Sequence, residues 1–414
     1  MPIDFQVPDN MLYGSPQSML DGDLNYVSYK PVSGETFTSG KSFKININSD
    51  NEWLVPQKSY LKFNLKLTGG ATTAGNCITT LGAASVLQRV TTSVSGRNIE
   101  DTPDYPTYVS SLYKRATTTQ QNALKELELY GNQTLLTVSA NAYSNGYTVC
   151  HAIRNALFEC DQNIPVAFLA GGINVEIELS DYRKLLANTA GGSTDFSVSS
   201  VELICGMLKP SDSYIKQFQA SLSAGRQATI PMTIIRAFKT QPSTASAEQD
   251  LQLHCGFHRS LRSVLAVRKL SSNINSTSAD EFNVDTLAGL KEYYFQIGSQ
   301  RWPRNCTIKT QNDVSSGAPC AEHYMQMLTS LDNTFPHLNA VAHSGTNTGQ
   351  AIYFNFASNR SFGQGIPVED GVLRINLSHN SAPSASEMTV FLAIDAVLKI
   401  DASDVSFTTQ DIFN

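Results

Sequence analysis

The segment VPQKSYLKFNLKL, residues 55–67, contains the alternation that decides the fold class. After the Pro-Gln-Lys turn, every second side chain is apolar, and the positions between them are Lys62, Asn64 and Lys66. The apolar positions are Leu61, Phe63, Leu65 and Leu67. Successive side chains of a β-strand point to opposite faces, so this period of two predicts a strand with one buried and one solvated face.

The composition extends this reading to the whole chain. The 414 residues are enough for two domains, and 16% of them are charged, against ~25% in ordinary soluble domains. A surface with few charges suits extensive contact with other proteins. The net charge of −6 argues against a strongly basic nucleic-acid-binding surface.

Most of the chain consists of short alternating or apolar runs separated by Gly, Ser, Asn and Thr, which is typical of an all-β protein. Helical signals are confined to residues 105–131, 211–225 and 320–333. The first of these places Leu124 and Leu127 on one face and has Gly131 as its stop. The second begins with Ser211 as N-cap, ends at Gly225, and aligns Tyr214, Phe218 and Leu222.

Two parts of the chain end alike. In the first, VEIELS (175–180) is followed by a polar loop and VELICGMLK (201–209). In the second, LRINLS (373–378) is followed by a polar loop and VFLAIDAVLK (390–399). The copies are about 200 residues apart, so the pattern predicts a duplicated domain rather than a repeat array.

An earlier pair of segments supports the duplication. VTTSVSGRNIED (90–101) precedes the first predicted helix, and YYFQIGSQRWPRN (293–305) precedes the helix near 320–333. The alternative is two unrelated all-β halves, because short alternating patterns are weakly specific. The duplication predicts five segments: an arm at 1–25, a first domain at 26–210, a helical linker at 211–225, a second domain at 226–401 and a tail at 402–414.

In pattern and order, four segments resemble the double jelly-roll major capsid proteins of adenovirus-like viruses, tailless icosahedral phages and large DNA viruses of eukaryotes. They are VPQKSYLKFNLKLTG, VLQRVTTSVSGRNIED with YPTYVSSLYK, YYFQIGSQRWPRN with AEHYMQMLTSL, and GVLRINLSHNSAPSASEMTVFLAIDAVLKID. The resemblance implies two eight-stranded jelly-roll β-barrels side by side, with short helices in the loops and linker. At 414 residues the connecting loops must be modest, so tall outward towers are not expected.

The same resemblance implies a non-enzymatic protein of the virion, synthesised in the host cytoplasm. Three chains would form a homotrimer of six barrels, a pseudo-hexagonal capsomer that builds an icosahedral shell. The implied partners are neighbouring capsomers and minor capsid or penton proteins, with an internal membrane or the genome at the inner face. The polar arm and tail are expected to become ordered by such neighbours.

Two motifs resemble ligand sites but lack the necessary context. GETFTSGKS (34–42) has five residues between Gly34 and Gly40 where a P-loop has four, and the following FKININ alternates as a strand. HCGFH (254–258) would present His254 and His258 together on a helix, but Gly256 disfavours one. We therefore predict no cofactor-binding residues and no metal ligands.

The charged clusters also have ordinary explanations. The pairs Glu126/Glu128 and Glu176/Glu178 lie on periodic elements, which predicts a solvated or interface face rather than a glycosidase pair. No G-x-S-x-G motif is present, so we predict no catalytic residues. The most basic stretch, HRSLRSVLAVRKL (258–270), contains Arg259, Arg262, Arg268 and Lys269 and is considered as a surface for nucleic acid or acidic lipid. Its few aromatic residues and the net negative charge of the chain argue against that use.

Two other classes of function remain as alternatives. A carbohydrate- or receptor-binding β-sandwich of a virion spike or fibre needs exposed aromatic clusters, whereas Trp53 and Trp302 lie near strands beside proline. A cupin-type enzyme needs several His and a Glu gathered on barrel strands, whereas the seven histidines are scattered.

The remaining signals concern the compartment. The first twenty residues lack the basic start and apolar run of a secretory signal, and no stretch reaches the ~18 apolar residues of a membrane span. We therefore expect the five N-x-S/T sequons to remain unmodified: Asn132, Asn275, Asn305, Asn359 and Asn376. The seven cysteines are widely spaced, which predicts free and mostly buried thiols: Cys77, Cys150, Cys160, Cys205, Cys255, Cys306 and Cys320.

Overall fold

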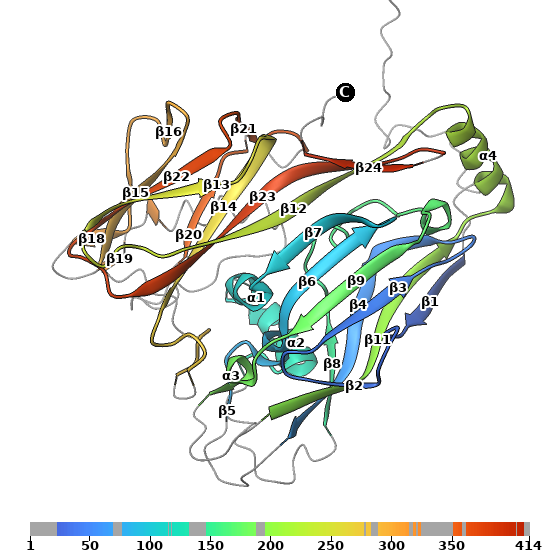
Figure 1. Cartoon of the computed structure of the whole chain (residues 1–414), viewed down its shortest axis with the longest axis horizontal. Coiled ribbons are helices and arrows are strands. Elements are labelled where there is room, and N and C mark those ends of the chain that lie inside the picture. Colours follow the sequence, from blue (N-terminus) through green and yellow to red (C-terminus); the bar gives the residue numbers. More distant parts are fainter. Residues whose placement is uncertain are drawn as a thin grey trace, which may run out of the picture.

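The structure is a computed structural model of the whole chain, and strands dominate it (Figure 1). It describes residues 23–68, 77–114, 116, 118–131, 146–187, 195–276, 279–282, 289–313, 318–319, 322–323, 351–357, 362–402 and 404–409. Most of the predicted arm and about half of the predicted tail lie outside these residues. So does the predicted helix at 320–333, apart from residues 322–323.

Eight strands of the first half form two facing sheets. One sheet contains, in spatial order, β1 (Asp23–Tyr29), β11 (Asp195–Lys209), β4 (Trp53–Thr68) and β8 (Tyr147–His151). The other contains β3 (Ser42–Ile47), β9 (Ile173–Leu179), β6 (Leu87–Val94) and β7 (Arg97–Pro103). All these pairings are antiparallel, as expected for a sandwich built from hairpins and crossovers.

Eight strands of the second half form a second pair of sheets. The first sheet contains β12 (Ala228–Thr240), β23 (Ser386–Ile400), β14 (His258–Leu270) and β20 (Ile352–Asn355). The second contains β13 (Glu248–His254), β22 (Val372–His379), β15 (Leu290–Ile297) and β16 (Gln300–Trp302). The two pairs of sheets lie next to each other and are joined through α4 (Asp212–Ser223) (Figure 1).

The strand order is identical in the two halves. If the eight strands of each half are numbered along the chain, one sheet has the order 1-8-3-6 and the other 2-7-4-5, in both cases. Eight antiparallel strands arranged in two such sheets form a jelly roll. The expected all-β fold of two eight-stranded jelly rolls is therefore confirmed, and the internal repeat is a repeat of topology.

The segments that predicted the repeat occupy corresponding strands. VEIELS and LRINLS belong to β9 and β22, the seventh strands, and the apolar segments that follow them belong to β11 and β23. The predicted strand–turn–strand segments are the hairpins β6–β7 and β15–β16. In the first hairpin, Ser95 and Gly96 both have positive φ, the conformation that a tight two-residue turn requires.

The stretch at 55–67 lies within β4, and its alternation corresponds to the two faces of the sheet. Leu61, Phe63 and Leu65 are buried in the first barrel, while Lys66 is exposed and Lys62 is partly exposed. The predicted wet and dry faces of this strand are therefore confirmed.

The remaining described elements are short. The smaller strands are β2 (Thr36–Thr38), β5 (Cys77–Ile78), β10 (Leu186–Ala187), β17 (Ile308–Lys309), β18 (Gln311–Asp313), β19 (Ala318–Pro319), β21 (Ile366–Val368) and β24 (Val405–Thr408). The 3-10 helices are η3 (Gly82–Val86) and η4 (Val166–Phe168). No helix in the described part of the chain is long and apolar enough to cross a membrane.

The predicted helix at 105–131 is two helices, α1 (Tyr105–Tyr113) and α2 (Thr118–Glu128). Leu124 and Leu127 both lie on α2, three residues apart, but only Leu124 packs against the core, and Leu127 is 45% exposed. The helix also stops before Gly131, because Leu129 already has a left-handed φ of 62°.

The predicted helix at 211–225 is α4, and its cap is as expected. The Ser211 side chain accepts a hydrogen bond from the backbone N–H of Tyr214, which satisfies an otherwise unpaired donor. The rings of Tyr214 and Phe218 pack against Trp53 of β4, with centroids 5.9 and 5.7 Å from that indole.

Candidate functional site: the joint between the two barrels

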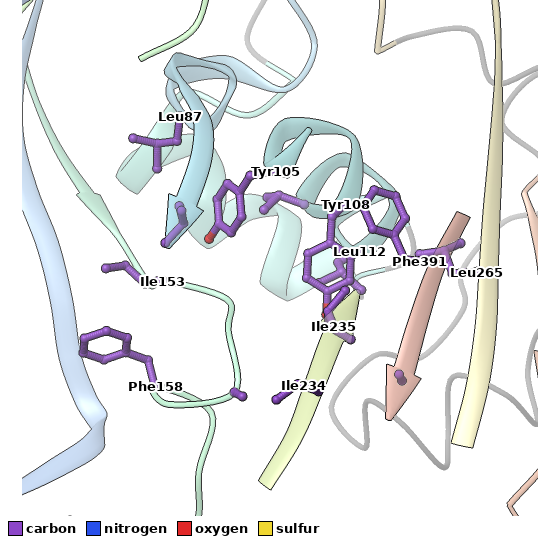
Figure 2. Close-up of a cluster of buried hydrophobic side chains, with 14 of the residues drawn as sticks. Leu87, Tyr105, Tyr108, Leu112, Ile153, Phe158, Ile234, Ile235, Leu265 and Phe391 are labelled. Atoms are coloured by element: carbon purple, nitrogen blue, oxygen red, sulfur yellow. The ribbon is translucent and has the colours of Figure 1, made fainter. Parts of the chain in front are cut away.

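An apolar cluster connects the barrels, and α1 of the first half lies at its centre (Figure 2). Tyr108 of α1 packs against Phe391 of β23, with ring centroids 5.3 Å apart. Leu112 of α1 belongs to the same cluster as Ile235 and Leu265 of the second half (Figure 2). A loop helix of one barrel thus fills the space beside the other barrel.

Strand β12 shows how the second barrel is adapted to this contact. Ile234 and Ile235 are adjacent in sequence and both buried, although adjacent residues of a strand point to opposite faces. Figure 2 shows both side chains in the cluster between the barrels, with Ile235 nearer to α1. The outer face of β12 is therefore covered by the first barrel.

A buried ionic cluster lies beside the apolar contact. Lys269 of β14 donates hydrogen bonds to Glu281 at 2.7 Å and to Thr107 of α1 at 2.5 Å. Lys184 of the short helix α3 (Tyr182–Leu185) lies 3.3 Å from Asp104 and 3.8 Å from Glu281. These four charged side chains are at most 8% exposed. Both barrels contribute one acid and one lysine, so the pairing itself joins the halves.

Two further groups of the second barrel complete the surroundings of Asp104. Thr389 of β23 donates a hydrogen bond to it at 3.1 Å, and Lys239 of β12 lies 3.7 Å away. Burial alone would raise the pKa of Asp104, but Lys269, Lys184 and Lys239 outweigh burial and hold that pKa well below its usual range. Asp104 is therefore ionised at neutral pH.

The pKa of Glu281 is set by the same two opposing effects, burial and the neighbouring lysines. Burial favours its neutral form, but Lys269 and Lys184 lower its pKa below the ordinary value. The ammonium of Lys269 also lies 4.7 Å from the centre of the Phe282 ring, which adds a cation–π contact. The cluster is thus a balanced set of buried charges and not a site with an excess of one sign.

Glu100 of β7 bridges the barrels in a different way. Its carboxyl accepts hydrogen bonds from the backbone N–H of Ile235 at 2.9 Å and of Ala156 at 2.5 Å. Strand β12 is an edge strand, and Glu100 satisfies one of the donors on its free edge. Burial raises the pKa of Glu100 to about 8, although these hydrogen bonds favour the ionised form.

Two peripheral contacts also link the halves. The backbone N–H and the hydroxyl of Thr80 both donate to Asp280 at 2.5 Å. Arg97 of β7 forms an exposed ion pair with Asp404, just before β24, at 2.7 Å. Exposed pairs contribute ~0–1 kcal/mol, so the buried groups dominate the joint.

The two ligand-like motifs have the local structure expected for them. After the turn at Gly40 the chain continues into strand β3 and forms no helix that could meet a phosphate. In HCGFH, His254 ends β13 and is exposed, whereas His258 is buried between the Thr409 hydroxyl and the Cys255 carbonyl. No group of three metal-ligating side chains occurs among the described residues.

Residues 258–270, whose use as a basic surface the sequence disfavoured, do not form one in the structure. This segment is β14, and three of its four cations are buried: Arg262, Arg268 and Lys269. Arg262 pairs with Asp395 at 3.2 Å, and Arg268 donates to the Ser386 hydroxyl at 2.9 Å. A strand buried on both faces needs such partners for its charges, and these cations therefore serve the interior.

The expectation for Glu128 is also wrong. This carboxylate at the end of α2 is 1% exposed and lies 3.0 Å from His151 Nδ1, while His151 Nε2 lies 2.8 Å from the Tyr105 hydroxyl. The three side chains are arranged in the order of a proton relay. All three are buried, however, and the Tyr105 hydroxyl already accepts a hydrogen bond from the backbone N–H of Arg154. Glu176 and Glu178, in contrast, point outward from β9 as predicted.

The cysteines agree with the predicted thiols where the structure describes their side chains. Five are free, and three of these are buried: Cys160, Cys205 and Cys255. Cys150 is partly buried and Cys306 is exposed.

A depression of ~240 Å³ lies on the outer face of the second barrel. Glu248, Asp250 and Glu292 line it, and each carboxylate already pairs with a neighbour, namely Ser378, Arg374 and Thr307.

Sequence reasoning did not single out Glu100, Asp104, Lys184 or Glu281. Asp104 was recognisable only as a polar residue before the Tyr-Pro start of a helix, because its partners come from distant strands. The positive φ of 56° at Asp104 is a local sign of constraint that only the backbone reveals.

These features define a double jelly-roll protein with a fused interior joint, and known structures share this fold. The chain matches a capsid chain of PBCV-1 with a TM-score of 0.63 and 12% identity, over 94% of this chain and 97% of that one. It matches the Sputnik virophage structure with 0.61 and 11%, over 99% and 94%. It matches the Faustovirus major capsid protein with 0.62 and 8%, over 95% and 92%.

At sequence level, no protein-family model matches the chain, and no curated protein sequence matches it. The double jelly-roll fold of these major capsid proteins is therefore shared with little remaining identity. The similarity lies in the order of the strands and not in sequence motifs. The resemblance found in the sequence likewise depended on the pattern and order of segments.

Proposed function

We propose that the protein is a viral major capsid protein that assembles as a homotrimer and tiles an icosahedral shell. The observation that carries the proposal is the buried joint, which packs two barrels of identical strand order against each other. An enzyme needs a cleft with available reactive groups. In this chain the buried titratable groups of the joint serve contacts between barrels.

The near-complete coverage of the matched capsid chains supports this proposal. Each match covers at least 92% of the length of the capsid chain, so it includes the whole molecule and not one shared module. On this basis we propose an arm at 1–22, barrels at 23–210 and 226–408, a linker at 211–225 and a tail at 409–414. The expected bounds of the arm (1–25) and of the tail (402–414) shift, because β1 begins at Asp23 and β24 ends at Thr408. The partners would be neighbouring trimers and minor capsid or penton proteins, within the virion.

The test is the size and shape of the purified chain. Sedimentation velocity and negative-stain imaging should show a species with three times the mass of the 45.1 kDa chain and a six-sided outline. A chain that stays monomeric at all concentrations, and forms no hexagonal plates or shells, would contradict the proposal.

The alternative of a spike or fibre module is not favoured. Trp53 is 5% exposed and packs under α4, and Trp302 packs its ring against Phe356. Among the described large apolar side chains, the exposed aromatics are Tyr26 and Phe257, which belong to different barrels. Binding of the monomer to a glycan array would be the result that favours this alternative.

A further inference from the structure

Glu100 of β7 is a buried carboxyl group between the barrels, and no cation lies beside it. The residue is 3% exposed. One carboxyl oxygen accepts hydrogen bonds from the backbone N–H of Ile235 and from the Thr102 hydroxyl, and the other accepts one from the backbone N–H of Ala156. Among the described residues, no lysine, arginine or histidine forms an ion pair with Glu100. Neutral donors therefore hold this carboxyl without a counter-charge.

The charged and titratable neighbours of Glu100 do not supply that counter-charge. In the loop after β8, Arg154 pairs with Glu159 at 3.3 Å, and the Glu159 carboxylate raises the pKa of Glu100. On α1, burial raises the pKa of Tyr108 well above its ordinary value, so this hydroxyl stays neutral. On β12, Arg236 is exposed to solvent. Glu100 therefore meets neutral groups, another acid, or a cation that is already paired or solvated.

The lack of a counter-charge decides which form of Glu100 the closed joint contains. A carboxylate buried in an apolar interior is strongly unfavourable unless a cation pairs with it. Burial accordingly raises the pKa of Glu100 to about 8, although its hydrogen bonds favour the ionised form. The neutral carboxyl occupies this position without that penalty. Loss of the proton leaves a buried anion that only water can then stabilise.

Strand β12 is the element that can move to admit this water. It is an edge strand, paired with β23 on one side, and its other edge faces Glu100. The pairing with β23 runs over all of 228–240. Separation of the free edge from β7 therefore leaves the sheet of the second barrel intact.

We propose that Glu100 is a proton-dependent latch between the barrels. With its proton it holds the free edge of β12 against β7, and without its proton this edge opens to water while both barrels stay folded. The inference goes beyond the proposed shell function, because it concerns a conformational change within one chain and holds for any oligomeric state.

The other contacts of the joint stay closed in the same pH range. Although burial opposes it, the neighbouring lysines hold the pKa values of Asp104 and Glu281 below their ordinary range, so both acids are ionised from neutral to alkaline pH. The ring contact between Tyr108 and Phe391 involves no charge. Opening is therefore confined to the edge of the joint that Glu100 occupies.

The chain contains a thiol that reports this opening. Cys160 of the first barrel is 4% exposed, and its Sγ lies 3.7 Å from the carbonyl oxygen of Pro231 in β12. Separation of β12 from the first barrel uncovers this thiol. Cys205 is fully buried in β11 of the first barrel and becomes accessible only when that barrel unfolds.

The test compares the full-length wild type with Glu100→Gln between pH 6 and pH 9. Brief exposure to iodoacetamide, followed by peptide mass spectrometry, gives the labelling rate of Cys160 in each protein. The ratio of the two rates cancels the intrinsic pH dependence of the thiol. This ratio should rise by at least about tenfold, because the pKa of Glu100 falls from about 8 in the closed joint toward 4.5 in water.

The matched control is Glu176→Gln, which removes an exposed carboxylate of β9. Its labelling rate at Cys160 should follow that of the wild type at every pH. Because Glu100 alone is expected to link labelling to pH, a substitution of the same kind elsewhere should have no effect.

Hydrogen exchange locates the movement in the chain. After correction for the intrinsic exchange rate at each pH, the protection of the Ile235 amide should fall with rising pH in the wild type and stay constant in Glu100→Gln. The amides of 390–394, in the interior of β23, should keep their protection in both proteins.

Each outcome supports or overturns the latch. The same pH dependence in the wild type and in Glu100→Gln would overturn it. Labelling of Cys205 together with Cys160, or loss of protection at 390–394 together with Ile235, would also overturn it, because the barrels would then be unfolding. If Glu100→Gln does not fold, the wild type decides alone: a rise with pH in the labelling of Cys160 relative to Cys205 supports the latch, and a constant ratio overturns it.

Discussion

Lys269 illustrates how single residues hold the joint together. Its side chain is 3% exposed, and its ammonium donates hydrogen bonds to Glu281 and Thr107 on opposite sides of the joint. Removal of one partner of a buried ion pair typically costs ~3–5 kcal/mol, because the other charge stays buried without compensation. We expect Lys269→Met to lower the free energy of unfolding by about that amount in urea denaturation.

The control for that substitution is Lys62→Met. Lys62 pairs with Glu202 at 3.4 Å on the surface of the first barrel and is 44% exposed, so its loss should cost at most ~1 kcal/mol. Equal losses for the two variants would show that the buried cluster contributes no more than a surface pair.

Glu100 gives the joint a dependence on pH. Its pKa is about 8 in the folded chain and near 4.5 when unfolded, so the folded state binds the proton more tightly. Stability from this group is therefore full below pH ~4.5 and declines as the pH rises toward 8. The free energy of unfolding of the wild type, minus that of Glu100→Gln, should fall by on the order of a few kcal/mol between pH 5 and 9. Urea titrations of both proteins at each pH measure it.

The outward carboxylate Glu176 provides the comparison for this titration. The Glu176→Gln variant removes an exposed carboxylate of β9 and serves as the control for the Glu-to-Gln substitution itself. A flat profile for Glu100→Gln would mean that Glu100 is ionised throughout, as its hydrogen bonds with Ile235 and Ala156 favour.

Among the elements, α1 is the one that makes two barrels into one body. Tyr108 is 1% exposed, and its ring lies between the barrels against Phe391. Truncation of a buried aromatic side chain costs ~3–5 kcal/mol. We expect Tyr108→Ala to reduce stability by this amount and to split the single calorimetric transition into two. Phe257→Ala, at an exposed turn, should keep one transition, and a single transition in both variants would mean that α1 is dispensable for coupling.

The strands also show how far the sequence predicts the molecule. The period of β4 and the paired endings of β9–β11 and β22–β23 depend on local alternation, and local alternation is visible in the chain. The burial of β14 is not visible in the sequence, because its cations depend on partners elsewhere. Arg262 pairs with Asp395, 133 residues away, and Lys269 pairs with Glu281, 12 residues away. From sequence alone, a strand with several cations is expected to be exposed to solvent, because the acidic partners become apparent only in the fold. The joint is therefore the part of the molecule that the sequence did not predict.

The behaviour of the whole molecule depends on whether the joint or the linker holds the barrels together. The chain between α4 and β12 is exposed at Gly225 and Arg226, so a protease recognition sequence inserted between them should be cut without unfolding either barrel. The apolar contact around Tyr108 and the cluster around Lys269 remain after the cut. We expect the two fragments to co-elute in size-exclusion chromatography as one particle.

The same cut made in a chain with Tyr108→Ala and Lys269→Met should give two fragments that elute separately. These substitutions remove the apolar and ionic parts of the joint together, and the linker no longer compensates for their loss. Dissociation of the cut wild-type chain would mean that covalent connection, and not burial, keeps the barrels side by side. Co-elution of the doubly substituted fragments would instead place the main contact elsewhere, at Glu100 and the edge of β12.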